Sequence, residues 1–274
     1  MTSILITGCS SGIGADAARG LRARGWRVLA TCRQEADAER LRGEGFESWA
    51  LDQADEQSVE RGAAEALERT SGALGAVFLN GAYGIPGAAE DVPRGAMRAI
   101  FEANLFGTHD LARRLIPAMR ARGAGRIVFC SSVLGIQAIP WRAAYNATKF
   151  AMEGLADTMR LELQDSGLHV VLIQPGPIAT RIRENSIPHF ERWIDWKASA
   201  LRERYEETLL KRLYEDRGPD RFQLPASAVT AALIRALEVP RPRPRYRVTT
   251  PTYIAELMRR LLTTRARDRI VGRW

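Results

Sequence analysis

The chain has 274 residues, 46% of them hydrophobic, which is enough to fill a substantial core. Its net charge of +8 could indicate a nucleic-acid partner, but the basic residues are spread over expected helix surfaces together with 32 acids. No basic patch is interleaved with aromatic residues, the pattern typical of single-strand binding. We therefore expect no nucleic-acid partner and a single domain over residues 1–274.

Membrane and metal sites are not expected either. No segment holds about 18 consecutive apolar residues, so no membrane span is predicted. The chain runs from Met1 directly into SILIT without a basic leader, which indicates a cytoplasmic protein. Its three cysteines and three histidines lack the spacing of a ligand set, so no metal site is predicted.

Short apolar runs alternate with longer segments of helical periodicity. This alternation is typical of a parallel sheet covered by helices on both faces. The runs that predict strands are 3–7, 26–32, 46–51, 75–80, 125–131, 168–175 and, after a proline-rich segment, 245–250. The sequence therefore predicts an α/β fold, a doubly wound Rossmann-type parallel sheet of about seven strands.

Two long helices are predicted from apolar residues spaced three and four apart. One covers residues 95–122 and the other covers 143–165, and each is followed by a glycine. The second helix carries Tyr145 and Lys149 in its first turns, four residues apart and therefore on one face. Lysine occurs only three times in the chain, which makes this pairing conspicuous.

The alternation stops after Thr180. Residues 181–224 are polar with interspersed aromatics, and an insertion at the carboxyl ends of the strands is a natural lid over a ligand. The alternative is a helical pair that packs its aromatics onto the sheet. Residues 251–270 predict a basic amphipathic helix, which could lie on a membrane, pair with another subunit or cover its own domain.

The segment ILITGCSSGIG places a glycine-rich turn between the first strand and a helix. Gly8 permits the tight turn, Gly12 lets a phosphate approach the backbone, and Gly14 permits close helix packing. Free N–H groups at the helix start favour a pyrophosphate, and Ser10 and Ser11 add hydroxyl donors. An ordinary tight turn is the alternative, but the position between strand and helix favours a dinucleotide site.

TGCSSGIG has the TGxxxGxG spacing of the short-chain dehydrogenase/reductase family, which the chain resembles. YNATK resembles its YxxxK, SS its serine site, ANLFGT its Asn motif and PGPIAT its PGxxxT. The resemblance runs from about residue 3 to 180, and details such as RYRVTT resemble the branch containing 17β-hydroxysteroid and retinol dehydrogenases. One departure is LNGA at 79–82, where the family has NNAG and Ala82 replaces a glycine.

The resemblance implies a catalytic set of Asn104, Ser132, Tyr145 and Lys149. Tyr145 would be the general acid for ketone reduction and the base for alcohol oxidation, and Lys149 would lower the pKa of a phenol that otherwise titrates at about 10. Ser132 would hold the substrate oxygen, and Asn104 would anchor a water for proton exchange. Ser131 is the alternative serine, but the family spacing favours Ser132.

Cofactor preference is indicated at the end of the second strand. Enzymes that prefer NAD have an acidic residue there, whereas here Cys32 occupies that position and Arg33 follows it. An arginine accommodates a 2′-phosphate, and Ser11 could add a hydrogen bond, so we expect NADP(H) in preference to NAD(H). The cofactor contacts implied by the resemblance are Gly8, Ser10, Ser11, Gly12, Ile13, Gly14, Arg33, Asp52, Asn80, Gly81, Tyr145, Lys149, Pro175, Gly176, Ile178 and Thr180.

These features predict an NADP(H)-dependent oxidoreductase that moves a hydride between nicotinamide and a ketone, aldehyde or secondary alcohol. Ile139, Trp141, Ile187 and Phe190 suggest an apolar substrate. The alternatives are an NAD-dependent alcohol dehydrogenase with the same site and a non-catalytic NADP(H)-sensing protein. The complete catalytic set favours an enzyme over a sensor. By resemblance, the two long helices would pair subunits into a homodimer or homotetramer.

Overall fold

The computed structural model describes residues 2–215 and 218–272, and its centre is one parallel sheet. The strand order is β3-β2-β1-β4-β5-β6-β7, and every neighbouring pair is parallel. The strands are β1 (Ser3–Ile6), β2 (Arg27–Cys32), β3 (Glu47–Ala50), β4 (Ala76–Leu79), β5 (Gly125–Cys130), β6 (Leu168–Gln174) and β7 (Arg245–Arg247). The predicted Rossmann-type fold is confirmed, with the strand order reversing between β1 and β4.

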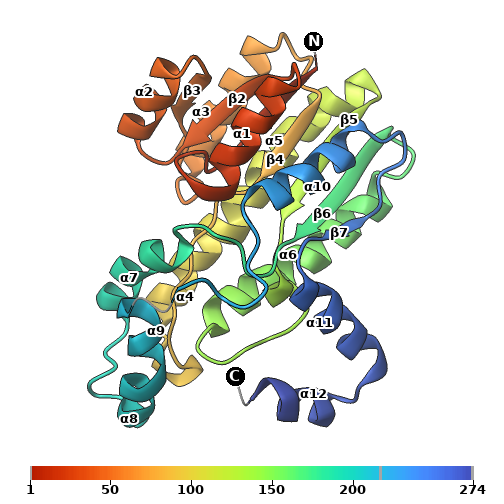
Figure 1. Cartoon of the computed structure of the whole chain (residues 1–274). Coiled ribbons are helices and arrows are strands. Elements are labelled where there is room, and N and C mark those ends of the chain that lie inside the picture. Colours follow the sequence, from red (N-terminus) through yellow and green to blue (C-terminus); the bar gives the residue numbers. More distant parts are fainter. Residues whose placement is uncertain (1, 216–217, 273–274) are drawn as a thin grey trace.

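Helices cover both faces of the sheet (Figure 1). The sheet-covering helices are α1 (Gly12–Ala23), α2 (Glu35–Gly43), α3 (Glu56–Arg69), α5 (Gly107–Arg122), α6 (Ala143–Glu162) and α10 (Ser227–Glu238). Residues of α3, α5 and α6 form one apolar core, and residues of α1, α2 and α10 form the other. Successive residues of β1 alternate between them: Leu5 belongs to the first core, whereas Ile4 and Ile6 belong to the second.

The helix predicted over 95–122 is interrupted. It consists of α4 (Arg94–Phe101), a π-helical turn (Glu102–Phe106) and α5. Such single π turns are frequent at functional sites. This one buries Asn104 completely, and Gly107 follows it where an added Cβ would lie 1.7 Å from the Gln53 carbonyl oxygen. The helix predicted over 143–165 is α6, three residues shorter.

Residues 181–215 form a separate group beside α4, at the lower left of Figure 1. The group contains α7 (Ile182–Trp193), α8 (Arg202–Arg204), a π-helical turn (Tyr205–Leu209) and α9 (Leu210–Tyr214). Phe190 and Tyr205 are buried in a third apolar cluster together with Ile100 of α4, not on the sheet. The Tyr205 hydroxyl donates to Asp91 and accepts from the Ala88 amide, each at 2.7 Å, which fixes this group to the segment after β4.

The C-terminal segment differs from its prediction as one helix over 251–270. It forms two helices, α11 (Thr250–Leu261) and α12 (Thr264–Val271), because Thr263 has an extended backbone and caps α12 through its hydroxyl. The apolar stripe of α11 is exposed, with Leu257 58% and Leu261 71% accessible, so it does not cover its own domain. The opposite face, which holds buried Glu256, packs inward.

Among the described residues, no helix is both long and apolar enough to cross a bilayer.

Candidate active site

The glycine-rich turn lies at the carboxyl end of β1, beside the reversal in strand order, where sheets of this class bind ligands. Gly8 and Gly12 have positive φ angles of 72° and 56°, which residues with a side chain rarely adopt. An added Cβ at Gly14 would lie 2.2 Å from the Gly8 carbonyl oxygen. The Ser11 side chain precedes α1 and makes no capping hydrogen bond, so its hydroxyl and the helix N–H groups fit a phosphate.

Three of the four expected catalytic residues line one cavity, of about 570 Å³. They are Ser132 after β5, and Tyr145 and Lys149 on α6. The expected cofactor residues that line the same cavity are Ile13, Asn80, Pro175, Gly176, Ile178 and Thr180. The volume lies in the range of small-molecule sites, and the cavity therefore joins the turn that would hold a nucleotide to the side chains that would do chemistry.

Lys149 is buried beside Tyr145, with its ammonium 5.5 Å from the centroid of the phenol ring. Its ammonium donates a hydrogen bond of 2.7 Å to the Cys130 carbonyl oxygen, and burial lowers the Lys149 pKa. Burial also raises the pKa of the Tyr145 phenol well above its usual value, and Ser132 and Arg142 oppose that shift. Sequence reasoning missed Arg142, one turn before the tyrosine, as a further cation that favours the phenolate.

Asn104 does not line the cavity, and its side-chain amide is bound by protein groups. Its Oδ1 accepts from the Tyr83 amide at 3.1 Å, and its Nδ2 donates to the Tyr83 carbonyl at 2.9 Å and to Thr148 at 3.3 Å. Thr148 in turn donates to the Tyr145 carbonyl oxygen. Asn104 therefore ties the segment after β4 to the helix that carries Tyr145 and Lys149.

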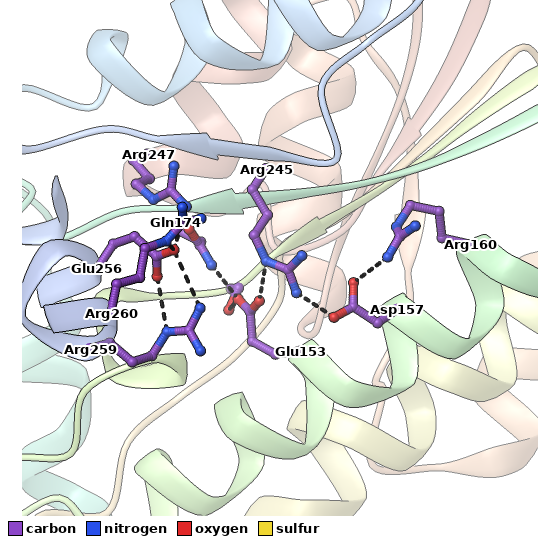
Figure 2. A network of polar contacts seen from close by, with 10 residues as sticks. Glu153, Asp157, Arg160, Gln174, Arg245, Arg247, Glu256, Arg259 and Arg260 are labelled. Carbon is purple, nitrogen blue, oxygen red and sulfur yellow. Dashed lines mark hydrogen bonds and ion pairs between the residues drawn. The ribbon is translucent and has the colours of Figure 1, made fainter. Parts of the chain in front are cut away.

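The two adjacent serines have different partners, and Figure 2 shows the network that one of them joins. The Ser131 hydroxyl donates to buried Glu153, which also accepts from Gln174 and Arg245. Ser132 accepts a hydrogen bond of 3.1 Å from the Leu134 amide, and its hydroxyl acts on the Tyr145 phenol, where a substrate oxygen would bind. This difference supports Ser132 as the serine that acts on substrate.

The segment LNGA keeps a tight link to β1 despite its departure from the family pattern. The Thr7 hydroxyl accepts from the amides of Asn80 and Gly81, and Asn80 Nδ2 donates to the Thr7 carbonyl oxygen. An added Cβ at Gly81 would lie 2.0 Å from Gln53. Ala82 is exposed at the cavity and has no positive φ angle, so its methyl group is accommodated.

The loop from Pro175 to Thr180 is held from both sides. The Pro175 carbonyl accepts from the Val133 amide at 2.7 Å, and Ile178 pairs with Leu224 in an isolated bridge. Thr180 lies against the turn: an added Cβ at Gly12 would be 3.1 Å from its methyl group. These contacts place the loop beside the start of α1.

A second arginine joins Arg33 near the end of β2. Arg33 is exposed, and Arg40 of α2 donates a 2.9 Å hydrogen bond to the Ser10 carbonyl oxygen in the turn. Arg40 was not predicted, because its position depends on how α2 folds back toward the turn. Asp52, after β3, is partly buried and its carboxylate accepts from the Ala54 amide.

The helical group reaches over this end of the site through His189 of α7. Its ring stacks on Tyr83 with ring centroids 4.0 Å apart. Burial lowers the His189 pKa, and the positive charges of Arg33 and Arg192 lower it further, so Arg33 lies near the stacked pair. Both rings were overlooked in the sequence because aromatic stacking across about a hundred residues leaves no local pattern.

This fold, glycine turn and serine, tyrosine and lysine arrangement define a class of nucleotide-dependent oxidoreductases. The short chain dehydrogenase family model matches residues 2–190, and the chain belongs to this family. It is 38% identical to the uncharacterized oxidoreductase YbbO of Escherichia coli over 270 residues, which is 98% of this chain and 93% of that protein. It is 30% identical to human 17-beta-hydroxysteroid dehydrogenase type 1, covering 95% and 81% of the two chains.

Solved structures agree with the fold. A short-chain dehydrogenase from Streptomyces avermitilis is 25% identical, with a TM-score of 0.77 over 99% of this chain and 97% of that one. One from Burkholderia phymatum in complex with NAD has a TM-score of 0.78 at 22% identity, covering 99% and 95%. One from Burkholderia cenocepacia in complex with NADP has a TM-score of 0.76 at 20% identity, covering 98% and 97%. The expected family membership is confirmed.

Proposed function

We propose that the protein is an NADP(H)-dependent oxidoreductase that transfers a hydride between nicotinamide and an apolar ketone, aldehyde or secondary alcohol. The observation that carries the proposal is that Ser132, Tyr145 and Lys149 line the same cavity as Ile13 and Thr180. The first three side chains suit binding of a carbonyl oxygen and delivery of the proton that this oxygen receives on reduction. The last two belong to the turn and the loop that would hold the nucleotide.

The proposed chemistry uses Tyr145 as the general acid and base. When bound, NADPH supplies a hydride with its electron pair. In reduction, the carbonyl carbon accepts the hydride and its oxygen accepts the Tyr145 phenol proton, so an alcohol and the oxidised nucleotide result. Ser132 would donate a hydrogen bond to the same oxygen as negative charge develops on it. A raised phenol pKa keeps Tyr145 protonated near neutral pH, which is the form that reduction requires.

The preference for NADP(H) rests on this chain's own residues, because solved relatives hold either nucleotide. Arg40 donates to the Ser10 carbonyl oxygen in the turn, Arg33 directly follows β2, and Cys32 is buried where an acid would bind a 2′-hydroxyl. Guanidinium groups bind phosphate oxygens in pairs of charge-assisted hydrogen bonds. The arrangement therefore supports a site for the 2′-phosphate.

The direct test follows 340 nm absorbance with NADPH, and separately with NADH, across a panel of apolar aldehydes and ketones. Tyr145→Phe is the matched variant, with NADPH binding measured by fluorescence to show that its site is intact. We expect turnover with NADPH that falls by a factor of about 100 or more in the variant. Tight NADPH binding by the wild type without reduction of any carbonyl would favour a sensing protein instead.

We also propose that α5 and α6 pair subunits into a homodimer or homotetramer. Phe106, just before α5, is 50% exposed, and Phe150 on α6 is 45% exposed, which is unusual for large apolar side chains on long helices. Light scattering on the wild type and on Phe150→Glu tests this, and a monomeric wild type would refute it. A cytoplasmic location stays a prediction.

A further inference from the structure

The cavity that holds Tyr145 is lined by three arginines from three separate parts of the chain. Arg142 directly precedes α6, Arg183 lies on α7 and Arg212 lies on α9. We refer to these three residues as the arginine cluster. Because the helices arrive from different directions, the cluster is a product of the fold and is not one basic helix face.

The positive charge of the arginine cluster is only partly balanced. Arg183 and Arg212 share one carboxylate oxygen of Asp220, at 3.4 and 3.7 Å. The hydrogen bond of Arg142 goes to the adjacent Trp141 carbonyl, and among the described residues Arg142 forms no ion pair. The other acid lining the cavity, Glu184, is paired with Arg181 at 3.3 Å.

Gathering these guanidinium groups has an electrostatic cost. Burial, with the charges of Arg212 and Arg183, lowers the Arg142 pKa to about 10, and Asp220 only partly offsets this. Like charges in a partly desolvated site repel, and surface arginines normally avoid such a position. A bound anion would relieve the repulsion and could accept charge-assisted hydrogen bonds from several guanidinium groups.

We propose that the arginine cluster binds an anionic group of the substrate, in the simplest case a carboxylate, while the reacting carbonyl lies at Ser132 and Tyr145. The substrate class is then an oxo acid with an apolar body, which Leu134, Ile139 and Leu213 of the same cavity would contact. This assignment rests on the proposed oxidoreductase function. It narrows the expected substrate from an apolar carbonyl compound to an amphipathic one.

The test compares substrates that differ only in that charge. Initial rates with saturating NADPH are measured for 4-formylbenzoate against its methyl ester, and for 8-oxooctanoate against its methyl ester. The enzymes are the wild type, the double variant Arg183→Gln/Arg212→Gln and the control Arg202→Gln. Arg202 is 60% exposed on α8, is paired with Glu206 and does not line the cavity.

We expect the wild type to have a larger kcat/KM for each acid than for its ester. The double variant should raise KM for the acids by about 10- to 100-fold while changing KM for the esters by less than about threefold, with kcat retained. Arg202→Gln should match the wild type. Equal or better use of the esters by the wild type, with no acid-specific change in the double variant, would overturn the assignment.

A second measurement distinguishes an anion site for the substrate from a site for the cofactor. NADPH affinity is measured for every variant, and a loss there without an acid-specific change in KM would mean that the cluster serves the cofactor, which overturns the inference. If no aldehyde is reduced at all, the proposed function fails by itself. Calorimetric titration of the acids and esters then decides the anion site: acid binding that the double variant loses supports it, and equal binding of acid and ester refutes it.

Discussion

The ammonium of Lys149 lies 2.7 Å from the Cys130 carbonyl oxygen and 5.5 Å from the centroid of the Tyr145 ring. The lysine is 2% exposed, so its ammonium contacts the end of β5 and the face of the aromatic ring and has little contact with solvent. Its hydrogen bond joins α6 to the end of β5, the strand that Ser132 follows. The positive charge of Arg142 also favours the phenolate of Tyr145.

Replacing Arg142 should therefore change the pH dependence of the reaction. Alcohol oxidation needs the phenolate, and removing a cation that favours the phenolate raises the Tyr145 pKa. We expect the pH-rate profile for oxidation by Arg142→Gln to move to higher pH. Arg142→Lys, which keeps the charge, serves as the control. An unshifted profile in the glutamine variant would show that Arg142 does not act on the phenol.

Arg33 and Arg40 should determine the choice of nucleotide. Arg33→Ala and Arg40→Ala should each raise KM for NADPH by about 10- to 100-fold and leave KM for NADH nearly unchanged, because only NADPH carries the 2′-phosphate. Arg19→Ala, on α1 and paired with Glu44, is the matched control and should behave as the wild type. Equal effects on both nucleotides would argue against a 2′-phosphate site here.

Gly14 and Gly43 form a contrasting pair of helical glycines. An added methyl at Gly14 would lie 2.2 Å from the Gly8 carbonyl oxygen, whereas Gly43 has no heavy atom within 4 Å of that position. Gly14→Ala should lower the free energy of unfolding by about 1–3 kcal/mol and weaken NADPH binding. Gly43→Ala should change the free energy by less than about 1 kcal/mol. Urea unfolding and nucleotide titration of both variants test this, and an undisturbed Gly14→Ala would contradict the close approach.

Glu153 should be important for stability because it is buried and serves three partners. It is 7% exposed and binds Ser131, Gln174 and Arg245. Glu153→Ala leaves the Ser131 and Gln174 donors unpaired and removes one of the two carboxylates that Arg245 binds, the other being that of Asp157. It should cost about 2–4 kcal/mol in urea unfolding, less than a fully buried pair because Arg245 is partly exposed.

The matched control for Glu153 is Glu65→Gln, which alters an exposed pair with Arg69. It should cost less than about 1 kcal/mol. Equal losses in the two variants would mean that the network around Glu153 adds no more stability than a surface ion pair.

Glu256 should make the packing of α11 sensitive to acid. Contacts with Arg247, Arg259 and Arg260 lower the pKa of this carboxyl to about 2, from a usual value of 4.5, against the opposing effect of burial. A lowered folded-state pKa contributes stability that is complete above about 4.5 and is lost as pH falls toward about 2.

The check on Glu256 is thermal unfolding between pH 6 and pH 3. The wild type should be more stable than Glu256→Gln near pH 6, and the difference should shrink as pH falls through that range. A constant difference at every pH would show that the carboxylate charge is not what holds α11.

The sequence by itself determined the fold class, the glycine-rich turn after the first strand and the helix that carries Tyr145 and Lys149. These features depend on local periodicity: parallel strands are apolar on both faces, and residues four apart share a helix face. The glycine spacing is equally local, because a positive φ angle at Gly8 or Gly12 restricts the residue type at that position.

Only the tertiary structure decided which groups act on one another across the site. Arg142, Arg183 and Arg212 are separated by 41 and 29 positions in the chain, yet they line one cavity because α7 and α9 pack beside the start of α6. Lys149 reaches Cys130 because of how α6 packs against β5. The apolar stripe of α11 is exposed because the opposite face of that helix, with Glu256, packs inward. Such pairings depend on long-range packing and burial, which leave no periodic signal in the sequence.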